Sequence, residues 1–198
     1  MYKTHQRMIA KFSKESPDNL KWTKGLALTS IRQDFWLLRS QLLDLKKYGI
    51  ESKYLFGSKK AGWEYIINNK QNLYNKIYSN KISLAEKLLE VASIPNIGLA
   101  KAGFILQLTL GKVGCLDVHN LNRFGIPSTV FRLNKVKYST ALRKAEYYIK
   151  TCEDLGGSEY LWNSWCEFVA EKYPWKYRNA NQVSRLHVDH IFSAVQDA

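Results

Sequence analysis

Apolar residues recur every three or four positions in the first quarter of the chain, and this spacing limits the folds that the sequence can adopt. The clearest run consists of Leu28, Ile31, Phe35, Leu38, Leu42 and Leu45. In an α-helix this spacing places all six side chains on one face, where they can be buried together. We therefore predict one long helix over about residues 26–47, with Gly49 as its C-terminal stop.

Helical signals continue along the rest of the chain. Ser83 and Glu86 have the spacing of a capping box, which opens a helix that Pro95 ends. We expect the remaining helices over about residues 59–78 with a break at Asn68 and Asn69, from Gly98 to Gly111, from Asp117 to near Gly125, from Ser139 or Thr140 to Leu155, from a Ser158 cap to Tyr173, and from near Asn181. No long strand alternation is present, so the predicted fold class is all-α.

The charge balance of the chain favours a polyanionic partner. Thirty Lys and Arg residues outnumber 17 Asp and Glu residues, which leaves a net charge of +13. Nucleic acid is the first candidate, and an anionic membrane surface is the second. No stretch reaches the roughly 18–20 apolar residues that span a bilayer. The N-terminal residues lack the apolar block of a secretory signal. We therefore expect a cytoplasmic protein without a membrane partner.

The cysteines point to a reducing compartment. Cys115, Cys152 and Cys166 are odd in number and widely spaced, which argues against a disulfide framework. Three scattered cysteines also cannot supply the four ligands of an iron–sulfur cluster. His187, Asp189 and His190 are close in sequence, but only the two histidines share a helical face. We therefore expect no metal site.

The segment from residue 88 to residue 125 predicts a helix, a tight turn and a second helix. The turn is Ile94-Pro95-Asn96-Ile97-Gly98, and two of its positions are expected to need unusual backbone geometry. Gly98 supplies one without steric cost, and Asn96 tolerates the left-handed region better than most residues. The small residue Ala102 lets the helices approach closely. The start of the second helix can then hold a phosphate through its unpaired amides.

This segment resembles the helix-hairpin-helix and Gly/Pro-loop-Asp signature of the endonuclease III and 8-oxoguanine DNA glycosylase superfamily. Members carry a hairpin of the form L-P-G-V-G, a small residue four positions on, and then V-D-T-H or V-D-V-H. The present chain has Ile94–Gly98, Ala102 and Leu116-Asp117-Val118-His119, with Asp117 19 positions after Gly98. Asn96 replaces the first hairpin glycine. The resemblance covers about 40 residues directly.

The resemblance implies a two-lobed helical fold with its active site in the cleft between the lobes. The whole chain, 1–198, would be one domain, with the hairpin motif at about 83–111, the glycine loop and aspartate at 111–119, and C-terminal helices at 139–198. The implied partner is double-stranded DNA, bound by a monomer. The only cofactor that the resemblance allows is a monovalent cation at the hairpin.

Residue by residue, the resemblance assigns catalysis to Asp117. A fixed carboxylate can stabilise the oxocarbenium-like charge that builds when an N-glycosidic bond breaks, and it can orient the attacking water. His119 matches the family's histidine and is expected to support the loop. The DNA-binding residues would be Asn96, Ile97, Gly98, Lys101, Lys112 and Gly114. Asp117 could also be a simple helix N-cap.

One departure bears on the type of reaction. Bifunctional members place a nucleophilic lysine two residues after the last hairpin glycine, and this chain has Ala100 there. Lys101 is rotated by about 100° on a helix and should point elsewhere. We therefore expect a monofunctional glycosylase that uses water and leaves an abasic site, without strand cleavage.

Alternatives are open for the target base and for the type of reaction. Because it lacks the nucleophilic lysine and the iron–sulfur cysteines, the chain resembles an atypical branch of the superfamily. This branch contains α-glutamyl/putrescinyl thymine pyrophosphorylase-like proteins and modified-base glycosylases associated with phage DNA. A glycosylase of this branch would release a hypermodified or glucosylated pyrimidine, as antiviral defence. One alternative is a transferase that joins an amino acid or amine to phosphorylated 5-hydroxymethyluracil in phage DNA. Another is a non-catalytic DNA-binding protein.

Overall fold

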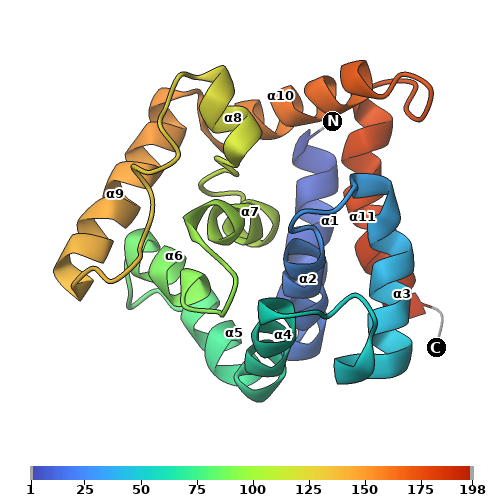
Figure 1. The fold of residues 1–198 in the computed structure, drawn as a ribbon, viewed down its shortest axis with the longest axis horizontal. Coiled ribbons are helices and arrows are strands. Elements are labelled where there is room, and N and C mark those ends of the chain that lie inside the picture. Colours follow the sequence, from blue (N-terminus) through green and yellow to red (C-terminus); the bar gives the residue numbers. More distant parts are fainter. Residues whose placement is uncertain (1, 197–198) are drawn as a thin grey trace.

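The protein is all-helical, as the sequence predicts. The computed structural model describes residues 2–196, and this part of the chain forms eleven α-helices, two 3-10 helices and no strand (Figure 1). The α-helices are α1 (Tyr2–Glu15), α2 (Pro17–Thr29), α3 (Leu38–Tyr48), α4 (Ser58–Asn68), α5 (Lys70–Tyr78), α6 (Leu84–Ala92), α7 (Leu99–Leu110), α8 (Val118–Arg123), α9 (Tyr138–Asp154), α10 (Gly157–Lys172) and α11 (Ala180–Gln196). The 3-10 helices are η1 (Phe35–Leu37) and η2 (Gly49–Glu51).

Helix α7 is the centre of the molecule. Its residues 102–109 are all buried, which is the pattern of a helix surrounded by others rather than of a surface helix. It packs on α1, α2 and α6, and Figure 1 shows it in the middle of the bundle. The apolar run Phe104-Ile105-Leu106 therefore faces neighbours on several sides. The turn before α7 and the loop after it are therefore both attached to a buried helix in the centre of the protein.

The two ends of the described chain pack on each other. Helix α11 lies against α1, α3 and α10. The His5 ring shares a 2.7 Å hydrogen bond with the Ser184 hydroxyl, and Ile9 and Phe12 of α1 are buried. Helix α1 and the first part of α2 were not predicted. Their apolar residues are sparse and lie among lysines, so the sequence signal is weak there.

The predicted continuous helix over residues 26–47 is wrong, because the chain breaks between α2 and α3. Helix α2 ends at Thr29, the φ angle of Arg32 is +54°, and η1 precedes α3. The Thr29 and Ser30 hydroxyls donate to carbonyls of the last turn of α2. Helical spacing could not reveal the break, because both helices bury their stripes in one core.

The other helix predictions hold, with small shifts at their ends. Asn69 separates α4 from α5, and Ser83 and Glu86 form the predicted capping box. Ser158 is the exception, because it is not the N-cap of α10. That helix follows Gly156, whose φ angle is +103°. None of the helices within residues 2–196 is long and apolar enough to cross a bilayer.

Gly62 of α4 allows this helix to approach the hairpin turn. A Cβ atom added at Gly62 would lie 2.5 Å from the Pro95 carbonyl oxygen and 3.0 Å from Leu28 Cδ1. The carbonyl belongs to the backbone and cannot rotate away. We therefore expect Gly62→Ala to lower the free energy of unfolding by about 1–3 kcal/mol in a denaturant titration.

Gly98→Ala is the matched control for this prediction. Among the described residues, no atom lies within 4 Å of a Cβ added at Gly98. The control should change stability by less than about 0.5 kcal/mol. Equal stabilities of the two variants would contradict the close contact between α4 and the turn.

Candidate active site

The turn between α6 and α7 is tight and carries its strain at Asn96. The Ile97 amide donates a 2.9 Å hydrogen bond to the Ile94 carbonyl, and the φ angle of Asn96 is +70°. A proline followed by a residue with positive φ is the pattern of a type II turn. The predicted left-handed conformation of Asn96 is thus confirmed.

Gly98 does not need unusual geometry, contrary to our expectation. Its angles are φ −97° and ψ −178°, an extended conformation that any residue can adopt, and it precedes α7 as the N-cap. Asn96 and Gly98 are exposed, whereas the Ile97 side chain is in the core. The outer face of the turn therefore consists of Asn96 and Gly98. Nothing in the fold requires a glycine at position 98, because the space in front of it is open.

The loop after α7 is held from within the protein. Gly111 ends α7 in the left-handed region, with φ +64°, and Lys112 is exposed. Gly114 is buried, and a Cβ atom there would lie 2.4 Å from Leu161 Cδ1. The buried Tyr148 hydroxyl donates to the Gly114 carbonyl and accepts from the Leu116 amide, both at 2.8 Å. This placement gives Gly114 a structural role inside the loop.

Asp117 follows this loop as the N-cap of α8. Its Oδ1 atom accepts hydrogen bonds from the amides of His119 at 3.1 Å and Asn120 at 3.0 Å. The Asn120 side chain donates to the Cys115 carbonyl at 2.6 Å. The N-cap geometry is therefore present. Because Oδ2 makes no hydrogen bond to any residue in 2–196, the carboxylate is fixed through one oxygen while the other can act.

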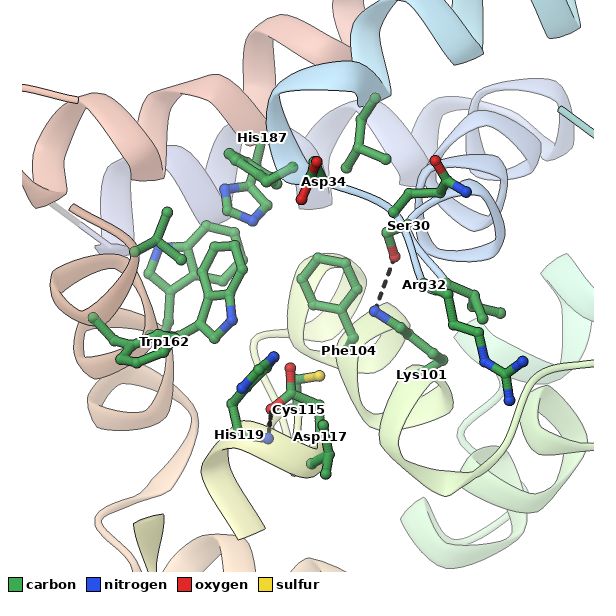
Figure 2. A pocket seen from close by; sticks show the side chains of 18 of the residues that line it. Ser30, Arg32, Asp34, Lys101, Phe104, Cys115, Asp117, His119, Trp162 and His187 are labelled. Carbon is green, nitrogen blue, oxygen red and sulfur yellow. Dashed lines mark hydrogen bonds between the residues drawn. The ribbon is translucent and has the colours of Figure 1, made fainter. Parts of the chain in front are cut away.

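A cavity of about 410 Å³ opens beside Asp117. Its walls come from the α2–η1 connection, from α7, from the loop before α8, and from α10 and α11. This volume lies within the range of small-molecule sites. Figure 2 shows Asp117, Phe104 and His187 converging on the cavity from different elements. Asn96, Lys101, Asp117 and His119 are the predicted site residues that line it.

The walls of the cavity are largely aromatic, and most of these rings were not predicted as site residues. The rings that line the cavity are Phe35, Trp36, Phe104, Trp162, Trp165, Phe168 and Tyr173. His119 is exposed, and its ring centroid lies 5.6 Å from that of Phe168. Trp162 also belongs to the buried core. A wall of ring faces suits a flat unsaturated ligand.

Lys101 lines the same cavity as Asp117, so the prediction that it points elsewhere is wrong. Its Nζ atom donates a 2.9 Å hydrogen bond to Ser30 Oγ and lies 5.5 Å from the Phe104 ring centroid. The long side chain of Lys101 reaches the cavity although the residue is one position beyond Ala100 on the helix. The broken segment after α2 also supplies a partner for it, which an uninterrupted helix would not.

Two further groups at the cavity were missed. Asp34 lines it as a second carboxylate, and it lies in the segment that we predicted as helix. Cys115 is half-buried, and burial raises the pKa of its thiol to about 12, with Asp117 adding to the effect. Cys115 is therefore a neutral thiol and not a nucleophile at physiological pH. All three cysteines are free.

The described residues contain no cluster of metal ligands. In the part of the chain that the structure describes, no group of three or more His, Cys, Asp or Glu residues could hold a metal ion.

Comparisons with known proteins add no identification. No family model matches the chain, and neither a curated protein nor a solved structure matches it.

Two buried histidines of α11 predict a loss of stability in acid. Burial lowers the pKa of His187 to about 3 and that of His190 to about 4, helped respectively by His190 and by Arg39. Unfolded histidines have pKa values near 6.5, so below that pH the unfolded chain binds protons that the folded chain does not. Their contribution to stability is complete above about pH 6.5 and is lost progressively as the pH falls toward the folded values.

We therefore expect the free energy of unfolding to fall between pH 6.5 and pH 4.5 by up to about 1.4 kcal/mol per pH unit for each histidine. Chemical denaturation at a series of pH values measures this slope. His190→Phe should make the profile flatter. A stability that is constant over this range would contradict the burial of neutral histidines.

Proposed function

We propose that this chain is a monofunctional DNA glycosylase with the two-lobed helix-hairpin-helix fold. It would hydrolyse the N-glycosidic bond of a modified pyrimidine flipped out of duplex DNA and leave an abasic site. The observation that carries the proposal is the position of Asp117, whose carboxylate lines a cavity with aromatic walls beside a tight hairpin. Release of a hypermodified or glucosylated phage pyrimidine would make the activity an antiviral defence.

The reaction needs a negative charge beside the sugar. As the bond between the sugar and the base breaks, positive charge develops on the sugar in an oxocarbenium-like transition state. A preorganised carboxylate stabilises that charge, and it can accept a proton from the attacking water. The amides of His119 and Asn120 hold Oδ1 of Asp117, which leaves Oδ2 for this work.

The cavity suits an extruded base. Enzymes that act on a base in duplex DNA rotate it out of the stack into a pocket, where it stacks on aromatic or apolar side chains. Phe104, Trp162 and Trp165 provide such surfaces, and they come from two helices that face each other across the cavity. In this proposal, one lobe carries the hairpin and Asp117, and the other carries α10 and α11.

DNA would bind along the hairpin edge. The open space before Gly98 allows a phosphate to approach the amides at the start of α7. Asn96 is exposed in the turn before α7 and Lys112 in the loop after it, and the net charge of +13 favours a polyanion. Contacts of this kind position the strand without reading its sequence.

The surroundings of Lys101 favour water as the nucleophile. Its Nζ atom donates a hydrogen bond to Ser30 Oγ and lies 5.5 Å from the Phe104 ring centroid, and these contacts hold it at the end of α2. Lys101 would therefore contribute positive charge at the mouth of the cavity, where DNA phosphates pass.

Asp117→Asn tests the catalytic assignment. Asparagine is also a good N-cap, so the variant should fold and bind DNA as the wild type does. We expect the rate of base release to fall at least about 100-fold while affinity changes less than about threefold. The assay incubates duplexes with a panel of modified bases, including glucosylated 5-hydroxymethylcytosine, and identifies released bases and digested nucleosides by mass spectrometry.

Asp34→Asn is the matched control, since it removes another carboxylate from the same cavity and should keep base release within about tenfold of wild type. An abasic product that depends on Asp117 supports the glycosylase. A heavier nucleoside in intact DNA would contradict the glycosylase and indicate the transferase. DNA binding without any product would indicate a non-catalytic DNA-binding module.

Lys101 gives a separate test of the reaction class. Borohydride reduces a Schiff base to a stable adduct, so a lysine nucleophile would be captured on DNA during turnover. We expect no covalent complex with wild-type protein. Lys101→Ala should weaken DNA binding and lower the slope of log affinity against log salt by about one. A trapped complex that Lys101→Ala abolishes, while Lys112→Ala does not, would establish a bifunctional enzyme instead.

A further inference from the structure

His187 presents an unpaired acceptor atom at the wall of the cavity. The residue lies on α11, its side chain is fully buried, and it lines the cavity that Asp117 also lines. Its Nδ1 atom is 3.1 Å from the Val183 carbonyl oxygen. A carbonyl oxygen can only accept, so Nδ1 carries the proton and Nε2 keeps its lone pair. Within residues 2–196, Nε2 has no hydrogen-bond partner.

The surroundings of His187 hold it in this form. Its ring centroid lies 4.2 Å from that of Trp162, 4.5 Å from that of Phe35 and 5.3 Å from that of Trp165. Packed rings fix the orientation of the imidazole, and burial lowers its pKa to about 3. The ring therefore stays neutral at physiological pH, and Nε2 remains an acceptor.

An unpaired buried acceptor is uncommon, and its place suggests its partner. Buried polar atoms in folded proteins are nearly always hydrogen-bonded. His190, one turn further along α11, also has unpaired nitrogens, but it does not line the cavity. Figure 2 shows the His187 ring on the cavity wall across from Asp117, with the Phe104 ring to one side of the line between them. Because Nε2 itself is buried, a ligand reaches it where the surrounding rings of Phe35 and Trp165 move aside, at the end of the cavity away from the carboxylate.

We propose that His187 selects the base by accepting a hydrogen bond at Nε2 from an N–H group on the edge of the base. This inference rests on the proposed function, in which the sugar lies beside Asp117. The base then extends past Phe104 toward α11, and its far edge meets His187. An exocyclic amino group or a ring N–H satisfies the acceptor, whereas an edge without a donor leaves it unpaired.

Binding of free bases tests this selection separately from bond cleavage. The probes are 5-hydroxymethylcytosine, which carries an N4 amino group, and its N4,N4-dimethyl derivative, which has no N–H donor at N4. Calorimetric titration of the full chain measures both affinities. We expect the amino base to bind the wild type at least about tenfold more tightly, because a site that hydrogen-bonds a group rejects the analogue that lacks it.

Two variants separate the hydrogen bond from a steric effect of the methyl groups. His187→Phe keeps an aromatic ring but removes the acceptor, so the preference should fall to within about twofold. His187→Gln can return an oxygen near the position of Nε2 and should restore part of the preference. His190→Phe is the matched control, because it changes a buried histidine off the cavity and should keep the wild-type preference.

The outcomes distinguish this inference from the proposed function. Equal affinities for the two bases, no binding of either base, or an undiminished preference in folded His187→Phe would overturn the role of His187, even if the protein releases bases from DNA. If the protein shows the expected preference but releases no base from DNA, the role of His187 stands and the glycosylase proposal falls. Thermal melts establish that each variant is folded. The comparison of the two bases with the wild-type protein requires no variant.

Discussion

The Tyr148 hydroxyl holds the loop on which the candidate site depends. It donates to the Gly114 carbonyl and accepts from the Leu116 amide, so one buried side chain satisfies two backbone groups of a segment without regular structure. Unpaired buried backbone groups are costly, and this bridge removes that cost. Gly103 allows the close approach, since a Cβ atom there would lie 2.3 Å from the Gly114 carbonyl oxygen. Asp117 follows immediately, and its direction is set by this loop and by the amides of α8.

The cavity beside Asp117 exists because the chain is interrupted after α2. Thr29 and Ser30 end the helix, and the next residues form the connection that reaches η1. This connection brings Phe35 against the α11 histidines and Ser30 against Lys101. The cavity is thus made from segments near residues 30, 100, 117, 165 and 187, and each segment contributes a different chemical group. Carboxylate, ammonium, aromatic faces and a neutral imidazole lie around one space.

Charge and burial are divided between the outside and the inside of the protein. The chain has an excess of 13 positive charges, and most of its lysines and arginines are exposed, where the proposed function would place them near a phosphate backbone. Inside, burial keeps two of the groups at the cavity neutral, as the raised pKa of Cys115 and the lowered pKa of His187 indicate. Asp117 lies between the two environments, half-buried and capped by amides. A carboxylate in that position can act on a charge that develops at the cavity mouth.

The sequence by itself determined the all-helical class, most helix boundaries, the strained turn at Asn96 and the N-cap position of Asp117. These features depend on neighbours within a few residues, so local spacing and turn chemistry are enough to reveal them. It also suggested an uninterrupted helix over residues 26–47 and a Lys101 turned away, and both predictions were wrong. Only the tertiary structure decided the break at Ser30, the direction of Lys101, the Tyr148 bridge and the place of His187. Each of these depends on contacts between segments far apart in the chain. The spacing of apolar residues predicts that one face of a helix is buried, but it does not predict which segment covers that face.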